Sequence, residues 1–234
     1  LEECGNSNST AAAQLNQTIH QIMRLCGQLS DGGRLILRRK TPHKEATDLA
    51  EFFRQFVAQA QPLVESAGRQ LEFSMPTVPL RADIDPSLLE RALYNLISNS
   101  MNYTPKGGTI SLSVQKTGRM LFVSVCDNGE GLSEQVRSTL FERFAEHSIG
   151  DSRWGIGLGL PMVREIARLH GGDIMVGGNP KGHGTCVTFS ISMERAALEL
   201  RSRPVRYDYC EGFHHGLVEL SDVLDADMFD PAEV

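Results

Sequence analysis

Two glycine-bearing motifs follow one another along this sequence of 234 residues. Residues 127–132 read Asp-Asn-Gly-Glu-Gly-Leu, and residues 155–160 read Gly-Ile-Gly-Leu-Gly-Leu. In the first motif a carboxylate ends an apolar stretch, and Gly129 and Gly131 leave room for backbone to approach a flat ligand closely. Asp127 could there accept a hydrogen bond from an exocyclic amine. The alternative is an ordinary tight turn, for which Asp-Asn-Gly is also typical.

The second motif places three alternating glycines directly before a segment of helical periodicity. Unpaired backbone N–H groups and the helix dipole favour phosphate at such a position. A dinucleotide-binding fold would require a strand before the glycines, whereas a polar loop precedes them, so we reject that fold. A merely flexible loop is the alternative, but it does not explain the other motifs.

A cluster of asparagines lies upstream of both glycine motifs. Asn95 and Asn99 are four residues apart in a predicted helix and therefore share one face, which Asn102 and Tyr103 continue. Asparagine is mildly unfavourable inside a helix, so the cluster invites a functional reason. An amide oxygen is a hard, neutral ligand that suits Mg²⁺. We favour this role for Asn99, while for Asn102 a ligand and a solvated surface residue are equally good interpretations.

Hydrophobic periodicity predicts the elements that position these residues. We expect a poorly ordered start over residues 1–13 and a long irregular stretch over 133–154. Helices are predicted over 15–29, 46–67, 86–102 and 158–170, and strands over 71–75, 78–84, 109–116, 120–126, 173–177 and 184–192. Helices on one face of a mixed sheet would satisfy this order.

Composition is that of an ordinary globular protein, with 41% apolar and 22% charged residues and no apolar run long enough for a membrane span. The net charge of -6 lies in the tail, because residues 205–234 hold eight acidic residues and one basic residue. The rest of the chain is close to neutral, which gives no support to nucleic-acid binding. Five scattered cysteines argue against zinc or a disulfide framework and favour a reducing compartment. Because the sequence starts at Leu1 without a signal peptide, we expect a fragment of a longer protein.

Residues 71–193 resemble the catalytic ATP-binding domain of sensor histidine kinases, in the superfamily shared with gyrase-type topoisomerases, the ninety-kilodalton heat-shock chaperone and mismatch-repair ATPases. Five ordered motifs carry the resemblance: the asparagine box 95–104, the glycine boxes 127–132 and 155–160, the phenylalanine box 140–144, and Gly-His-Gly-Thr at 182–185. The resemblance implies an α+β fold, a two-layer α/β sandwich of the Bergerat type, with a mixed, mostly antiparallel sheet, helices on one face and a preceding N-terminal helix.

Three parts of the chain follow from this resemblance. Residues 1–67 would be the end of a dimerisation and phosphoacceptor hairpin with a linker helix, residues 68–193 the ATP-binding catalytic domain, and residues 194–234 an acidic extension. We expect Val218, Leu220, Val223, Leu224 and Met228 to dock part of that extension on the domain, with its acidic residues facing solvent or a basic partner.

The resemblance also implies ATP and Mg²⁺ as cofactors and assigns the site. Asp127 would read adenine, Asn99 would bind the metal, Asn95 would lie at the phosphates or in the metal shell, and Arg143 and Asn95 would serve catalysis. The expected ATP-binding residues are Asn95, Asn99, Asn102, Tyr103, Asp127, Gly129, Gly131, Leu132, Phe144, Gly155, Gly157, Leu158, Gly159, Leu160 and Thr185. Residues 133–154 would form a lid over the nucleotide.

The implied activity is transfer of the ATP γ-phosphate to a histidine of the hairpin and then to a response regulator. Position 95 favours transfer over hydrolysis, because an amide cannot act as a general base. A hydrolysing ATPase and a nucleotide-binding pseudokinase remain the alternatives. Ser98, Asn102 and Glu146 depart from the family's usual acidic, lysine and arginine residues, and Arg143, His147 or Arg153 could compensate near the phosphate.

The expected partners are a response regulator and, in the longer parent, a second copy of the protein. We expect no nucleic acid, no membrane contact by this fragment and a cytoplasmic location, with membrane attachment of the parent left open. His20 lacks the acceptor motif of the hairpin, so it is expected on a helix surface, with the acceptor histidine upstream of Leu1.

Overall fold

The computed structural model describes residues 2–29, 41–132, 159–193, 210 and 212–230. Five helices, one 3₁₀ helix and seven strands make up these residues. In chain order they are α1 (Glu2–Gly27), β1 (Glu45–Asp48), α3 (Leu49–Ser66), β2 (Gln70–Ser74), β3 (Arg81–Ile84), α4 (Pro86–Tyr103), β4 (Thr109–Thr117), β5 (Met120–Asp127), α6 (Gly159–Leu169), β7 (Ile174–Gly178), β8 (Thr185–Ser192), α7 (His215–Glu219) and η2 (Ala226–Phe229).

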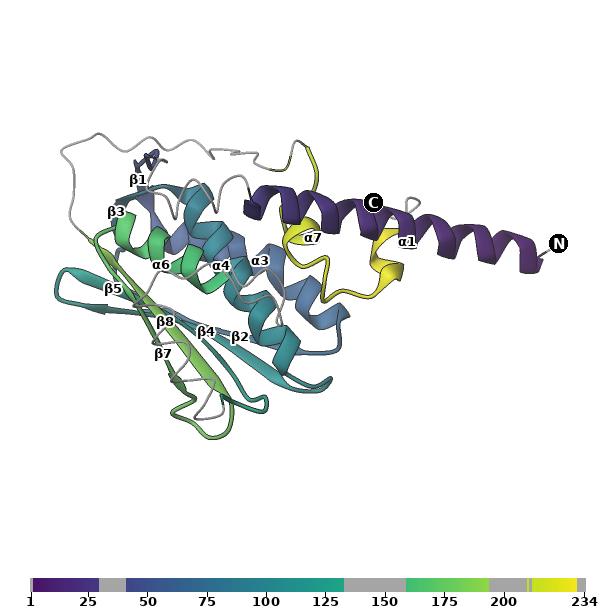
Figure 1. Ribbon diagram of the computed structural model, residues 1–234. Helices are drawn as coiled ribbons and strands as arrows, with labels where there is room; N and C mark the ends of the chain where they lie inside the picture. The colour runs from purple at the N-terminus through teal and green to yellow at the C-terminus, as the bar shows by residue number, and fades with distance from the viewer. Residues whose placement is uncertain (1, 30–40, 133–158, 194–209, 211, 231–234) are drawn as a thin grey trace.

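A five-stranded sheet in the order β2-β4-β5-β8-β7 forms one layer, and α3, α4 and α6 cover one of its faces (Figure 1). The β2–β4 pair is parallel, and the other three pairs are antiparallel. A separate two-stranded sheet joins β1 to β3. The fold class predicted from the sequence is therefore confirmed, although β1 was not predicted.

Alternating apolar residues bind the sheet to the helical layer. Along β5, Leu121, Val123 and Val125 are buried, and along β8 Val187, Phe189 and Ile191 are buried. Successive strand residues point to opposite faces, so each of these sets faces a single side of the sheet. Both sets belong to one hydrophobic core with residues of the three covering helices, and this core fixes the strand ends on which the candidate site stands.

Helix α4 lies in the middle of the molecule and positions the asparagines. Asp85 caps it, because its Oδ1 accepts a hydrogen bond from the backbone N of Leu88, and Pro86 occupies the first turn, where no N–H partner is needed. The helix packs against α6, the sheet, α3 and α7, and most of its residues are buried. A helix enclosed in this way holds its side chains in fixed directions.

The N-terminal helix begins at Glu2, whereas the sequence predicted a helix only from residue 15. Its partner is residues 212–230, which we call the C-terminal strap and which lies against α1 in Figure 1. The side chain of Gln17 donates hydrogen bonds to the carbonyl oxygens of Ser221 and Leu224, and that of Asn16 donates to Phe229. Docking of the extension is confirmed.

The strap corrects one further expectation. His20 is buried, with its ring packed edge-on against Phe213 and Phe229, and so does not lie on the helix surface. This expectation failed because sequence periodicity describes one helix, whereas the strap covers α1 from about 200 residues away. Glu219 of the strap is buried as well, and it lies beside Arg91, a basic partner of the kind expected for the acidic residues.

The expectation of unpaired cysteines is also wrong. Cys126 of β5 and Cys186 of β8 are opposite one another in the sheet and are joined by a disulfide bond. Their separation of 60 residues gives no sign of this pairing, which depends on the register of two strands.

The expected division of the chain into three parts remains a prediction. Phe53 and Val64 of α3 share one core with residues of the sheet, and the boundaries at residues 67 and 193 are not tested. Within the described residues, no helix combines the length and apolar character needed to cross a bilayer.

Candidate nucleotide-binding site

Asp127 ends β5 at the edge of the helical layer, and its carboxylate is buried. Its Oδ1 accepts hydrogen bonds from the backbone N of Gly129 at 3.0 Å and of Thr185 at 3.1 Å. Its backbone oxygen accepts another from Nδ2 of Asn179 at 2.7 Å. Among the described residues, the hydrogen bonds to the carboxylate all end on Oδ1, so Oδ2 is the oxygen that a ligand's amine could reach. The carboxylate is thus fixed by backbone donors before any ligand binds.

Glycines around Asp127 allow backbone segments to approach one another. A Cβ at Gly129 would overlap the carbonyl group of Tyr103, and a Cβ at Gly184 would overlap the carbonyl group of Asp127. Gly131 has a φ of 77°, in the left-handed region that disfavours other residues. The glycines therefore join the end of β5 to the end of α4 and to the β7–β8 loop.

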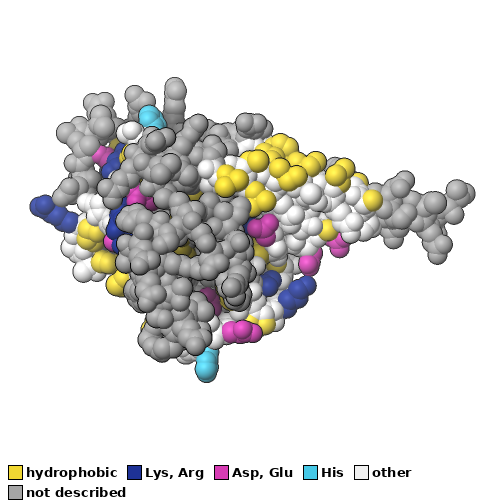
Figure 2. Space-filling model, viewed as in Figure 1, with side chains coloured by type: hydrophobic (Ala, Val, Ile, Leu, Met, Phe, Trp, Pro, Cys, Tyr) yellow, Lys and Arg dark blue, Asp and Glu magenta, His cyan; other side chains and the backbone are white. Residues whose placement is uncertain are grey.

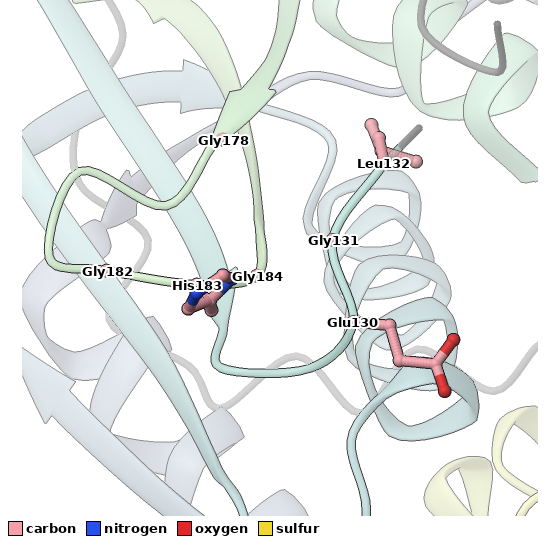
Figure 3. A pocket seen from close by; sticks show the side chains of 7 residues that line it. All are labelled: Glu130, Gly131, Leu132, Gly178, Gly182, His183 and Gly184. Carbon is pink, nitrogen blue, oxygen red and sulfur yellow. The ribbon is translucent and has the colours of Figure 1, made fainter. Parts of the chain in front are cut away.

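A half-open hollow of about 190 Å³ lies between the segments that follow Asp127 and precede Thr185, and Asp127 itself is not among its lining residues. Residues 130–132 form one wall and residues 182–184, with Gly178, form the other, and the two segments face each other in Figure 3. Gly131 and Leu132 were expected at the site from the sequence. Glu130, Gly178 and His183 were not, although the Gly-His-Gly-Thr motif indicated this loop.

Asn95 and Asn99 of α4 meet the first turn of α6. The Asn95 Nδ2 donates a hydrogen bond to the backbone oxygen of Arg91 at 2.9 Å, which orients its Oδ1 the other way. A Cβ at Gly159 would lie 3.1 Å from that Oδ1 and 3.7 Å from Nδ2 of Asn99. Two amide groups therefore lie against a helix N-terminus, where unpaired N–H groups attract phosphate.

This donor set fits a magnesium ion shared with phosphates. Asn95 and Asn99 supply neutral, hard amide oxygens, and Mg²⁺ commonly takes few protein ligands together with phosphate oxygens and waters. Across the described part of the chain, no group of three or more His, Cys, Asp or Glu side chains could hold a metal on its own. Any cation here would thus depend on the ligand's own phosphates.

Most of the predicted site residues that the structure describes form two groups. Asp127, Gly129, Gly131, Leu132 and Thr185 gather at the end of β5, while Asn95, Asn99, Gly159 and Leu160 gather between α4 and α6. Asn102 and Tyr103 are exposed at the end of α4. Arg143, Phe144, Gly155, Gly157 and Leu158 lie outside the described residues, as do His147 and Arg153.

Comparison with known proteins gives a consistent result. Residues 84–195 match the family model described as histidine kinase-, DNA gyrase B-, and HSP90-like ATPase. The chain is 31% identical over 188 residues to the adaptive-response sensory kinase SasA of Crocosphaera subtropica (strain ATCC 51142 / BH68). That match covers 78% of this chain and 49% of SasA, so the chain spans about half the length of this relative.

Solved structures share the fold. The catalytic domain of histidine kinase ThkA has a TM-score of 0.56 and 23% identity, covering 64% of this chain and 98% of the ThkA chain. ThkA in complex with the response regulator TrrA has a TM-score of 0.56 and 20% identity, covering 77% and 52%. At these identities the likeness concerns the fold alone.

Proposed function

We propose that this chain, whose residues 84–195 belong to the family of histidine kinase-, DNA gyrase B- and HSP90-like ATPases, is the ATP-binding catalytic part of a two-component sensor histidine kinase. One observation carries the proposal. A buried carboxylate held by two backbone N–H groups lies on the same side of the sheet as two amides that face a helix N-terminus. The first can read an adenine amine, and the second can receive phosphates.

In this proposal the ends of the site have separate tasks. Asp127 accepts the exocyclic amine of adenine, with Thr185 and Gly129 holding the carboxylate in place. At the other end, Asn99 binds Mg²⁺, Asn95 lies at the phosphates, and the N–H groups of Gly159 and Leu160 meet phosphate oxygens. A bound Mg²⁺ supplies charge neutralisation for the transferred phosphoryl group.

Phosphoryl transfer agrees better with Asn95 than hydrolysis does. Its Nδ2 is already engaged by the carbonyl of Arg91, and an amide has no basic lone pair with which to deprotonate water. The task left to these residues is to orient the nucleotide, so that its γ-phosphate can reach a histidine of the hairpin.

Partners of the whole protein are part of the same proposal. Along α1, Leu15, Ile19, Ile22 and Leu25 remain exposed at three- and four-residue spacing, and apolar side chains follow the edge of α1 in Figure 2. Leu29, two residues after the end of α1, is exposed as well. Such a seam suits helix pairing with a second copy. A response regulator receives the phosphoryl group, by analogy with the complex of ThkA and the response regulator TrrA. These events belong in the cytoplasm, where ATP is present.

Titration calorimetry with ATP and Mg²⁺ tests the nucleotide site. Asp127→Asn preserves size and removes the charge, so we expect ATP affinity to fall roughly ten- to a hundredfold, since a hydrogen bond to a charged group contributes about 1.5 to 3 kcal/mol. Asp173→Asn is the matched control, because that carboxylate lies at the far end of α6 and pairs with Arg164. Equal affinity of Asp127→Asn and the wild type would contradict the proposed adenine contact.

A further inference from the structure

The disulfide between Cys126 and Cys186 occupies a particular rung of the sheet. The ladder between β5 and β8 runs from Met120 opposite Ser192 to Cys126 opposite Cys186, and ends there. The bonded pair is thus the last rung on the side of the nucleotide site. Terminal rungs of a ladder open more readily than internal ones.

Next to that rung stand Asp127, which carries the proposed adenine-reading carboxylate, and Thr185, one of the two residues that hold this carboxylate. Asp127 follows Cys126 and Thr185 precedes Cys186, and the two are joined by the 3.1 Å hydrogen bond from the Thr185 backbone N to Oδ1 of Asp127. Nδ2 of Asn179 holds the Asp127 carbonyl from the same loop. If the terminal rung opens, the donors around this carboxylate separate from it.

The disulfide closes a loop that contains much of the candidate site. The loop closed by the disulfide spans 60 residues and contains both glycine boxes, helix α6 and the loop 178–184. Six further rungs pair β5 with β8, so reduction leaves the register of the sheet in place and frees only its end. We therefore expect the disulfide to order the end of the β5–β8 ladder at the candidate site, and to have a smaller effect on the fold.

Chemical access is unequal for the two sulfur atoms. Cys126 is buried, whereas Cys186 is only partly buried, so we expect an external thiolate to attack at Cys186. Of the remaining described cysteines, Cys26 is exposed and Cys210 is buried, and neither belongs to the bonded pair. They provide a matched comparison for the bonded pair.

We propose that Cys126 and Cys186 form a reversible thiol–disulfide site that tunes nucleotide affinity and exchanges with a low-molecular-weight thiol of the glutathione type. In reduction, a glutathione thiolate attacks Sγ of Cys186, and Cys126 leaves as a thiolate that takes up a proton. A second glutathione thiolate attacks the mixed disulfide at the glutathione sulfur, which gives glutathione disulfide and the Cys186 thiolate, protonated in turn. Oxidation by glutathione disulfide is the reverse, so atoms and electrons balance.

The oxidised chain binds nucleotide more tightly, because its carboxylate and donors are ordered before binding and less freedom is lost. This inference rests on the proposed nucleotide site. It adds a property that the motifs alone do not imply, since neither cysteine belongs to the glycine boxes or the asparagine box.

The test titrates ATP with Mg²⁺ into the chain after incubation with glutathione disulfide or with dithiothreitol. Intact mass, which differs by two hydrogens between the states, verifies the redox state. We expect the oxidised chain to have a Kd lower by roughly three- to tenfold. Cys186→Ser and Cys186→Val should each bind like the reduced chain under both conditions, while Cys26→Ser keeps the redox response.

The outcomes separate the two proposals. Equal Kd values for the verified oxidised and reduced chains overturn the inference and leave the nucleotide site standing. A pair that stays reduced in excess glutathione disulfide also overturns it. Absence of ATP binding in both states overturns the proposed function, and the inference with it.

Discussion

Helix α4 presents two adjoining groups of polar residues, which we call faces and which are covered in different ways. One face carries Asn95 and Asn99, neutral amides that lie against the N-terminus of α6. The other carries Glu90, Arg91 and Ser98, which α1 and the C-terminal strap cover. The second face, which we call the strap face, is covered by segments of the same chain. The first, which we call the amide face, is proposed to be covered by a ligand.

The chemistry of each face follows from what covers it. Arg91 and Glu219 are almost completely buried, with Nε and Oε1 3.4 Å apart, and Arg24 reaches both Ser98 and Asp222. Burial raises the pKa of Glu219, while Arg91 and Arg24 oppose that rise. Buried charges require partners, whereas neutral amides beside an open site do not. The strap face should therefore govern stability, and the amide face ligand affinity.

The largest effect is expected from Arg91→Met, which leaves Glu219 buried without its main partner. We expect the free energy of unfolding to fall by about 3 to 5 kcal/mol, measured by urea denaturation. Adding Glu219→Leu should restore most of the loss, because the pair is then replaced by apolar groups. A loss below about 1 kcal/mol would show that the charged face does not hold the strap.

Gly216→Val tests the fit of the strap without altering charge. A Cβ at this position would overlap Cδ1 of Leu63 and lie 3.0 Å from the hydroxyl of Tyr94. Overpacking of this kind costs about 1 to 3 kcal/mol, and we expect the strap to become the first site of limited proteolysis. Gly177→Ala is the control, since nothing lies within 4 Å of a Cβ there. Unchanged proteolysis of Gly216→Val would contradict close docking.

Asn99→Ala tests the amide face. Loss of the proposed magnesium ligand should weaken ATP binding about tenfold, or about 1.4 kcal/mol, in calorimetry with Mg²⁺ and much less with EDTA present. Stability should remain within about 0.5 kcal/mol, as for ordinary substitutions away from the core. Asn102→Ala, at an exposed position, should have the smaller effect. A variant that unfolds more readily but binds ATP equally well would reverse the comparison.

The smallest effect concerns His170, which joins α6 to the start of α4. Its Nε2 accepts a hydrogen bond from the Asp85 backbone N, so Nδ1 carries the proton that is donated to the Ile166 carbonyl. Burial lowers the pKa of His170 in the folded chain. Stability is therefore lost as pH falls through about 6.5, the unfolded value, by at most about 1.4 kcal/mol per pH unit.

Urea denaturation between about pH 7.5 and about pH 5.5, on either side of the unfolded histidine pKa of about 6.5, measures this slope. His170→Gln retains a donor and an acceptor at similar positions but cannot be charged, so its slope should be shallower. Identical slopes for the variant and the wild type would rule out His170 as the origin. ATP affinity should not follow this titration, because His170 lies away from both amides.

The residues of the candidate site, on the amide face and at the end of β5, could be selected from the sequence because ligand chemistry restricts residue types, and their roles remain predictions. Asp127, the glycines after it and Asn99 are recognisable by identity and spacing, and the sheet and its covering helices followed from periodicity. The strap face could not be predicted, since the contact of Arg24 with Asp222 joins residues 198 apart. Nothing in the local pattern around His20 distinguishes burial by a remote segment from exposure to water.

Register explains the other failure. Cys126 and Cys186 meet because two strands pair in one alignment among several, and a shift by one residue would separate their side chains. Their chemistry is visible in the sequence, but their partnership is not. The same holds for Asn179, whose contact with the Asp127 carbonyl depends on where the β7–β8 loop lies.

The position of the strap has a consequence for synthesis of the chain. A ribosome releases α1 and the sheet before residues 212–230, and domains begin to fold as they emerge. Until the strap arrives, His20 and Arg24 of α1 and the charged face of α4 have no cover. Helix α1 can therefore pack fully only after residues 212–230 have been synthesised. A chain that ends before them would keep the residues proposed to bind nucleotide, but α1 would lose its contacts with the strap.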